Sequence, residues 1–353
     1  MEGVSFGYEG EGVAGEVVFT TSMVGYPESL TDPSYFGQIL VFTYPLIGNY
    51  GVPKPIPVAP HCIKNFESEQ IWVKGVIVST YVDTPSHFTS RATLGQWLTQ
   101  EKIPALSDID TRMLTQKIRE KGVMKGQIIF KSNQKKEFIN IDDLNLVADV
   151  SIKKPILYSL PKPQLKKPVV LYDCGVKHGI IRALIGANVD LLRVPWDWQM
   201  DDINKYAAVL ISNGPGDPMR ADKTIDSIVS VLKSHLPVFG ICLGNQILAL
   251  AAGGKTYKLK FGHRSTNQPV HDSVTGRSYI TTHNHGFAVD MASLSDSWSE
   301  WFTNLNDGTN EGILHKQKPW FTIQFHAEAN PGPQDTMHLF DHFIQRVKEY
   351  EKK

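Results

Sequence analysis

The chain has 353 residues, of which 41% are hydrophobic and 20% charged, values typical of a globular protein large enough for two domains. Lysine and arginine number 36, as do aspartate and glutamate, so the net charge gives no reason to expect a nucleic-acid or membrane partner. No apolar run approaches the roughly 18–20 residues of a membrane span, and the N-terminal segment lacks the features of a secretory or transit peptide. The three cysteines, Cys62, Cys174 and Cys242, are too few for a disulfide framework, so we expect a cytoplasmic protein.

The first part of the chain, residues 1–150, has the pattern of a small α/β or α+β domain. Apolar stretches broken by glycine and proline predict strands at residues 17–24, 38–44 and 71–82. Two later stretches predict helices at residues 93–102 and 110–122. The second helix has Asp110 or Thr111 as a possible N-cap and Gly122 at its end.

A segment rich in proline and lysine follows at residues 151–167. Prolines at this density exclude a helix or a central strand, so the segment is predicted to be a linker. The domain prediction is therefore residues 1–150, a linker, and a second domain over residues 168–353.

The second domain alternates predicted strands and helices. The strands are expected at residues 168–173, 189–195, 206–211 and 236–241, and the helices at 178–188, 221–235, 245–254 and 337–353. This alternation predicts an α/β fold with a mostly parallel sheet flanked by helices. In such sheets, functional groups gather at the carboxyl ends of the strands.

The sequence Gly240-Ile241-Cys242-Leu243-Gly244 lies between a predicted strand and a predicted helix. It has the G-x-C-x-G form of a nucleophile elbow, whose sharp turn requires glycines on both sides of the nucleophile. The following helix directs free N–H groups and its positive end toward the sulfur, which favours a thiolate, and the Leu243 N–H is placed to bind an oxyanion. A buried structural cysteine is the alternative, and it is the expected role of Cys62 and Cys174.

A cysteine nucleophile needs a base, and His326 with Glu328 provides one candidate pair. They follow the apolar strand WFTIQF, and residues two apart in extended backbone point to the same side. On its own, an H-x-E pair is a weak motif, and a solvated loop is the alternative.

Two further segments carry polar or glycine-rich motifs. In residues 212–218, Gly214 and Gly216 can offer backbone N–H groups for a second oxyanion contact. In residues 281–290, His283 and His285 lack a nearby third ligand, so no metal site is predicted; Asn284 and Gly286 fit contacts to a small amide better.

Together these motifs resemble the class I, or triad, glutamine amidotransferases. They are GICLGNQ at residues 240–246, HAE at 326–328, SNGPGDP at 212–218 and NHGFAVD at 284–290. Residues 21–51 resemble the N-terminal domain of the carbamoyl-phosphate synthetase small subunit, which other triad amidotransferases lack. The sequence is most similar to the eukaryotic type, in which this unit begins a multifunctional pyrimidine-synthesis protein.

The resemblance implies a glutaminase that hydrolyses L-glutamine and delivers ammonia to a carbamoyl-phosphate synthetase, as a large subunit or fused domains. Cys242 would be the nucleophile, His326 the base and Glu328 its orienting carboxylate. The implied glutamine contacts are Ser34, Gly214, Gly216, Leu243, Gln246, Asn284, Gly286 and Phe287. No cofactor or metal is expected in this chain, because ATP and Mg²⁺ would act on the synthetase. The pyrimidine pathway is favoured over the arginine pathway.

Some residues depart from the family pattern. Asn245 stands where a histidine is usual, Ala327 where a proline is usual, and His283 where a glutamine is usual. The family's first strand is also expected to be missing before Met1, as in a chain that begins within the domain. Two other functions remain open from the sequence: a stand-alone cysteine hydrolase of the γ-glutamyl hydrolase type, and a catalytically weak scaffold.

Overall fold

The structure is a computed structural model that describes residues 1–130 and 136–352. The chain forms two compact units, Met1–Asp142 and Asp143–Lys353, and each is described by itself. Within the described residues, no helix has both the length and the apolar character that a membrane crossing requires.

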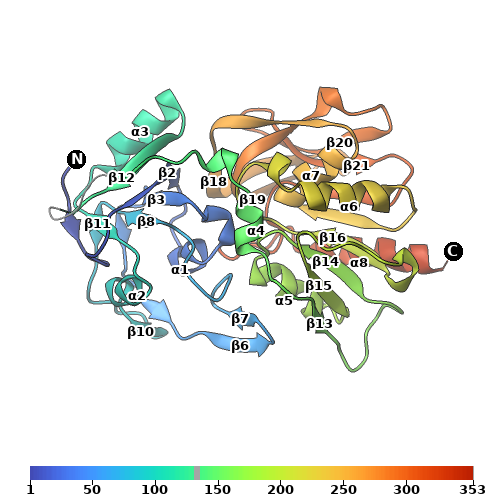
Figure 1. Ribbon diagram of the computed structural model, residues 1–353, viewed down its shortest axis with the longest axis horizontal. Coiled ribbons are helices and arrows are strands. Elements are labelled where there is room, and N and C mark those ends of the chain that lie inside the picture. Colours follow the sequence, from blue (N-terminus) through green and yellow to red (C-terminus); the bar gives the residue numbers. More distant parts are fainter. Residues whose placement is uncertain (131–135, 353) are drawn as a thin grey trace. The chain divides into compact units, whose positions relative to one another are not determined.

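The first unit is built on one mixed sheet (Figure 1). In spatial order its strands are β1 (Val4–Ser5), β11 (Ala105–Ser107), β8 (Gly75–Ile77), β3 (Gln38–Phe42), β2 (Val13–Thr20) and β12 (Met124–Ile128). The inner strands β11, β8, β3 and β2 are parallel, and both edge strands are antiparallel to them. Small two-stranded pairs complete the unit: β5 (Val52–Pro53) with β10 (Ser90–Ala92), β4 (Leu46–Ile47) with β9 (Thr80–Tyr81), and β6 (Ile56–Ala59) with β7 (Cys62–Lys64).

The helices of the first unit are α1 (Tyr26–Leu30), α2 (Leu94–Gln100) and α3 (Thr111–Lys121). The predicted helices at 93–102 and 110–122 correspond to α2 and α3. Thr93 forms a capping box at α2, and the Asp110 carboxylate accepts from the Met113 N–H at 2.8 Å, so Asp110 is the N-cap of α3. Gly122 ends α3 with φ 89°, a conformation that glycine adopts without strain.

The proline-rich segment differs from the linker that the sequence predicted. Residues 143–168 group with the second unit, and β13 (Ile156–Tyr158) pairs antiparallel with β15 (Leu191–Pro195). β13 is the edge strand of its sheet, a position that tolerates neighbouring prolines because one side of the strand needs no partner.

The second unit confirms the predicted α/β fold and extends it. Its sheet runs in the order β13, β15, β14 (Val169–Asp173), β16 (Ala208–Ile211), β17 (Val238–Ile241), β22 (Trp320–Ile323), β21 (Asn310–His315), β20 (Trp298–Asn304), β18 (Lys255–Asp272) and β19 (Ser278–Asp290). From β15 to β22 the neighbouring strands are parallel. From β21 to β19 they form an antiparallel arm that the alternating pattern did not predict.

Helices cover both faces of the parallel half. They are α4 (Leu146–Val150), α5 (His178–Gly186), α6 (Asp222–Leu232), α7 (Leu243–Ala251) and α8 (His338–Glu351) (Figure 1). Val238 lies in the apolar cluster that also contains Ile228 of α6 and Ile247 of α7. Phe239 instead packs on Phe343 of α8, at a ring distance of 5.4 Å. Because successive strand residues face opposite sides, α6 and α7 cover one face and α8 the other.

Candidate active site

Cys242 occupies the sharp turn between β17 and α7, as the G-x-C-x-G pattern predicted. Its backbone has φ 57° and ψ −104°, a strained conformation for a residue with a side chain, and it forms the N-cap of α7. The Cys242 N–H donates to the Ile323 carbonyl at 2.8 Å, which ties the turn to the end of β22. The sulfur is thus held at the carboxyl edge of the sheet and at the N-terminus of a helix.

The two glycines of the elbow are required by the packing of the backbone. A Cβ atom on Gly240 would overlap the Gly244 carbonyl, and a Cβ atom on Gly244 would overlap the Ile211 carbonyl of β16. These neighbours are main-chain atoms of strands and helix, so they have little freedom to move. The G-x-C-x-G spacing therefore reflects steric limits on both sides of the cysteine.

His326 and Glu328 lie together just beyond β22. The His326 Nδ1 atom is 2.6 Å from the Glu328 Oε1 atom, and both side chains are buried. They meet through a turn, in which the Ala329 N–H donates to the His326 carbonyl at 3.1 Å, and not through the extended backbone that the sequence suggested. The His326 ring is in contact with the Cys242 side chain, and because Nδ1 is bound to Glu328 while Nε2 makes no other hydrogen bond among the described residues, Nε2 is the nitrogen that faces the sulfur.

Lys177 is a site residue that the sequence analysis did not identify. Its Nζ atom lies 3.1 Å from Glu328 Oε1 and 2.7 Å from the Ala329 carbonyl oxygen, and the side chain is buried. Its backbone N–H donates to the Asn213 side chain at 3.0 Å. The sequence could have indicated Lys177 through its position, because it lies in the loop that follows the carboxyl end of β14, where functional groups gather.

The electrostatics of these residues favour an ionised pair. Burial by itself would lower the pKa of His326, but the Glu328 carboxylate, helped by a contact with the Cys242 side chain, raises that pKa to about 10. Burial would raise the pKa of Glu328, but the Lys177 ammonium and the His326 ring lower it to about 2. At neutral pH Glu328 is therefore a carboxylate that holds a positively charged imidazole in place.

The strand β19 contributes backbone atoms beside the cysteine. The Cys242 Sγ atom lies 3.6 Å from the carbonyl oxygen of Asn284. The Gln246 side-chain amide donates to the carbonyl of Phe287 at 2.9 Å, so α7 and β19 are joined next to the elbow. Gly286 lies between these two contacts in the chain.

The loop after β16 supplies the two predicted glycines. Gly214 adjoins Leu243, since a Cβ atom on it would lie 2.8 Å from the Leu243 side chain and would also overlap the Cys174 carbonyl. Gly216 has φ 82° and its nearest neighbour is Leu146 of α4. The structure thus brings Gly214 to the elbow, while Gly216 lies against another element of the unit.

The remaining predicted contact, Ser34, belongs to the first unit. It lies in a short 3-10 helix, Pro33–Tyr35, where its N–H is bound by the Asp32 carboxylate at 2.9 Å. Its contact with glutamine stays a prediction.

The other two cysteines fit the structural role expected of them. Cys62 and Cys174 are buried and form no disulfide, and burial raises the pKa of Cys174 to about 12.

Comparison with known proteins agrees with both units. Residues 170–346 match the family described as glutamine amidotransferase class-I, and residues 1–128 match the carbamoyl-phosphate synthase small chain, CPSase domain. The arginine-specific small chain of carbamoyl phosphate synthase from Saccharomyces cerevisiae is 46% identical over 99% of this chain and 87% of its own length. The chain belongs to the carbamoyl-phosphate synthase small-chain family.

Other relatives of this small-chain family member are much longer. The multifunctional protein pyr1-3 of Dictyostelium discoideum is 48% identical over 98% of this chain, but the match spans 16% of that protein. The multifunctional protein ura1 of Schizosaccharomyces pombe is 45% identical over 99% of this chain and 17% of its own length. Among solved structures, a glutamine amidotransferase from Thermotoga maritima covers 54% of this chain and 87% of its own, with 18% identity and a TM-score of 0.40.

Two departures from the small-chain pattern are accommodated by local contacts. The Asn245 side chain is buried on α7, where it donates to Gln324 at 2.9 Å and accepts from the Thr322 hydroxyl at 2.5 Å. Ala327 is also buried, and the loop around it is held on one side because the His326 N–H donates to the Thr282 carbonyl at 2.8 Å. On the other side, Lys177 binds Ala329, so the His326 loop is anchored without a proline.

Proposed function

We propose that this chain is the glutaminase component of a carbamoyl-phosphate synthetase. It hydrolyses the side-chain amide of L-glutamine, and the released ammonia serves a synthetase for carbamoyl phosphate synthesis. The observation that carries the proposal is the Cys242 turn beside a buried His326–Glu328 pair, with the free Nε2 of the imidazole available to the sulfur. Family membership and the matched amidotransferase domain support the same reaction.

The first half of the reaction forms a thioester. The thiol proton lies on His326 Nε2, in the imidazolium that the Glu328 carboxylate stabilises, and the sulfur attacks the amide carbon of glutamine. Negative charge develops on the amide oxygen, and we assign its binding to the N–H groups of Leu243 at the helix N-terminus and of Gly214 in the glycine loop. The imidazolium then gives its proton to the leaving nitrogen, so ammonia departs and a glutamyl thioester remains.

The second half releases glutamate. His326, neutral once it has protonated the leaving nitrogen, removes a proton from water, and the hydroxide adds to the thioester carbon. The carbon–sulfur bond breaks, and His326 keeps the proton taken from water, which restores the starting state of the pair. One glutamine and one water are thus converted to one glutamate and one ammonia. Glu328 stabilises the imidazolium in each half without leaving its hydrogen bond.

The residues proposed to bind the substrate are those that membership of the family suggests, and one of them, Ser34, belongs to the first unit. The proposed glutamine contacts are Ser34, Gly214, Gly216, Leu243, Gln246, Asn284, Gly286 and Phe287. The Gln246 amide nitrogen is already bound to Phe287, so its contribution to glutamine binding is through its oxygen or through the backbone it fixes.

The partner is a synthetase that binds ATP and Mg²⁺, supplied as a large subunit or as fused domains. We assign the carbamoyl phosphate to pyrimidine synthesis, which the multifunctional relatives support. The arginine-specific relatives support arginine synthesis instead. Expression of the chain together with its synthetase in hosts that need uracil or arginine would separate them. Rescue of uracil growth is expected, and rescue of arginine growth alone would contradict the branch assignment.

Glutamate release by wild type, Cys242→Ser and Cys174→Ala, with and without a synthetase, tests the proposal. We expect the Cys242 variant to lose turnover and the Cys174 variant to retain it. A glutamine-analogue electrophile should modify Cys242 of the wild type and leave Cys174 unmodified. A scaffold would show neither turnover nor modification, and a stand-alone hydrolase would show turnover that a synthetase does not change. Either result would overturn the proposal.

A further inference from the structure

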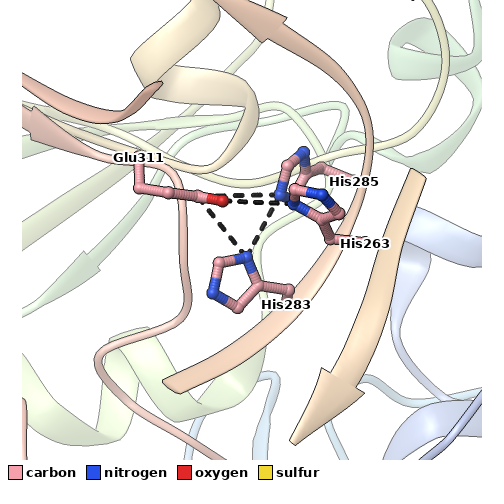
Figure 2. Close-up of side chains that lie close together, drawn as sticks. All are labelled: His263, His283, His285 and Glu311. Carbon is pink, nitrogen blue, oxygen red and sulfur yellow. Dashed lines mark hydrogen bonds and ion pairs between the residues drawn. The ribbon is translucent and has the colours of Figure 1, made fainter. Parts of the chain in front are cut away.

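Four buried side chains converge on the antiparallel arm of the second unit. They are His263 of β18, His283 and His285 of β19, and Glu311 of β21. Each offers one ligand atom, and these atoms lie within 4.8 Å of one another (Figure 2). His283 and His285 share a face of their strand because they are two residues apart, and His263 is the cross-strand partner of His285.

The distances between these atoms match the edges of a metal coordination shell. His283 Nδ1 lies 3.2 Å from His285 Nε2 and 3.4 Å from Glu311 Oε2. His263 Nδ1 lies 3.1 Å from Glu311 Oε1, and His285 Nε2 lies 3.8 Å from Glu311 Oε2. Ligands about 2.0–2.1 Å from a tetrahedral zinc ion would be roughly 3.3–3.4 Å apart.

The outer nitrogens of two of the histidines are held by acceptors. His263 Nε2 lies 2.8 Å from the Asp307 carboxylate, and His285 Nδ1 lies 2.9 Å from the Phe287 carbonyl. Each of these nitrogens must carry a proton to make its bond. In the neutral rings, His263 Nδ1 and His285 Nε2 therefore direct lone pairs into the cluster.

The third histidine is oriented by a hydroxyl relay. His283 Nε2 lies 2.7 Å from the Thr281 hydroxyl oxygen, and that hydroxyl donates to the Gln268 carbonyl at 2.9 Å. A hydroxyl has one hydrogen, so with that hydrogen donated to Gln268, His283 Nε2 is the donor to Thr281. His283 Nδ1 therefore also directs a lone pair into the cluster.

The three histidine lone pairs face the Glu311 carboxylate, and too few hydrogen-bond donors are present to satisfy all of these acceptors. The Glu311 Oε2 atom is fully buried and accepts no hydrogen bond from the described residues. The Asn304 amide donates to the other oxygen, Oε1, at 2.9 Å and lies 3.5 Å from His263 Nδ1. Two imidazole acceptors 3.2 Å apart beside a bare carboxylate oxygen repel one another unless a cation lies between them.

We propose that His263, His283, His285 and Glu311 bind one divalent first-row transition metal ion, of the zinc type. Three imidazoles and one carboxylate fill a tetrahedral shell, so the site is structural and closed. The bonds to Asp307, Thr281 and Phe287 are the outer-shell contacts that orient ligating histidines. This replaces the expectation of no metal, which considered His283 and His285 alone, because the other two ligands come from strands that are distant in the sequence.

The ion would fix the part of β19 that faces the cysteine. His283 and His285 flank Asn284, whose carbonyl lies 3.6 Å from Cys242 Sγ. The Phe287 carbonyl, which binds His285 Nδ1, also accepts from Gln246 of α7. The metal would thus join β18, β19 and β21 directly behind the active-site backbone, and it would take no part in the reaction itself.

The test uses untagged full-length protein that has been stripped with a chelator and then titrated with Zn²⁺. We expect the wild type to bind one equivalent with a rise in Tm, and Co²⁺ to give the visible bands of a tetrahedral complex. His283→Gln and Glu311→Gln should weaken Zn²⁺ binding by more than the roughly 10–100-fold that outer-shell changes produce. His235→Gln, which removes an exposed histidine of the same unit, is the matched control and should bind like the wild type.

Wild-type protein that takes up no Zn²⁺, or His283→Gln that binds it as tightly as the wild type, would overturn the proposal. If hydrogen bonds between the four side chains hold the cluster together without a metal, the wild type will take up no Zn²⁺. If the ligand variants fail to fold by circular dichroism, Asp307→Asn replaces them, since it leaves all four ligands in place and should weaken binding about 10–100-fold. The readouts are metal content and affinity, so loss of glutaminase activity would not mimic either outcome.

Discussion

The Nζ atom of Lys177 lies 3.1 Å from Oε1 of Glu328, the same oxygen that lies 2.6 Å from Nδ1 of His326. One carboxylate oxygen therefore joins a lysine from the loop after β14 to the proposed catalytic base beyond β22. Lys177 also binds the Ala329 carbonyl, so it fixes both the charge and the backbone of the His326 loop. We regard it as a positioning residue, because it acts through Glu328.

Replacing Lys177 with methionine should lower kcat/KM by up to about 100-fold, because the loop that carries His326 loses its anchor. The lysine holds the pKa of Glu328 down, so its removal should also move the acid limb of the pH–rate profile to higher pH. Steady-state glutaminase kinetics across pH measure both effects. Lys205→Met is the control, since Lys205 pairs with Asp201 on the surface. A fall in rate without any change in the pH profile would indicate a purely structural role.

Glu328→Gln should reduce kcat by about a thousandfold or more, while KM for glutamine changes little. The amide cannot stabilise the imidazolium that carries the thiol proton, although it can still hydrogen-bond to Nδ1. Stopped assays of glutamate release check the rate, and circular dichroism checks the fold. Glu349→Gln, on the exposed face of α8, is the matched control. Activity within tenfold of the wild type would remove Glu328 from the mechanism.

The same substitution predicts a pH-dependent difference in stability. The folded pKa of Glu328 is about 2 against an ordinary 4.5, so its contribution is present above pH 4.5 and is lost as pH falls toward 2. The folded pKa of His326 is about 10 against an ordinary 6.5, so its contribution is present below pH 6.5 and is lost as pH rises toward 10. The wild type should therefore exceed Glu328→Gln in free energy of unfolding most strongly between pH 4.5 and 6.5.

Urea unfolding of both proteins at a series of pH values measures this difference. Other titrating groups are common to the two proteins, so they cancel in the comparison. A difference that stays constant across the whole range would contradict the ionised pair.

Gly244→Ala should destabilise the second unit strongly, because its Cβ atom would overlap the Ile211 carbonyl of β16. Overpacking against main-chain atoms costs about 1–3 kcal/mol or more. Gly186→Ala is the matched control, since a Cβ atom there meets nothing within 4 Å and the residue lies at the end of a helix. The control should be neutral or slightly stabilising in thermal unfolding. Equal Tm values for the two variants would mean that the elbow is looser than its geometry indicates.

Local features of the sequence predicted much of this protein. The N-cap and the C-terminal glycine of α3 and the Cys242 turn depend on neighbouring residues, so a short window contains the information. The β-α alternation predicted the parallel half of the second sheet for the same reason. The antiparallel arm was not predicted, because β18 and β19 carry many polar residues and lack a clean alternation.

Only the tertiary structure decided the contacts between segments that are remote in the chain. Lys177 reaches Glu328, and His263 and Glu311 join His283 and His285, through the order of strands in the folded sheet. No local pattern encodes these pairs, because side-chain proximity there is set by strand neighbours far apart in sequence. The residue types and the sharp turn at Cys242 were readable from the chain itself, whereas the partners that give its charged groups their pKa values came from packing in a buried, low-dielectric interior.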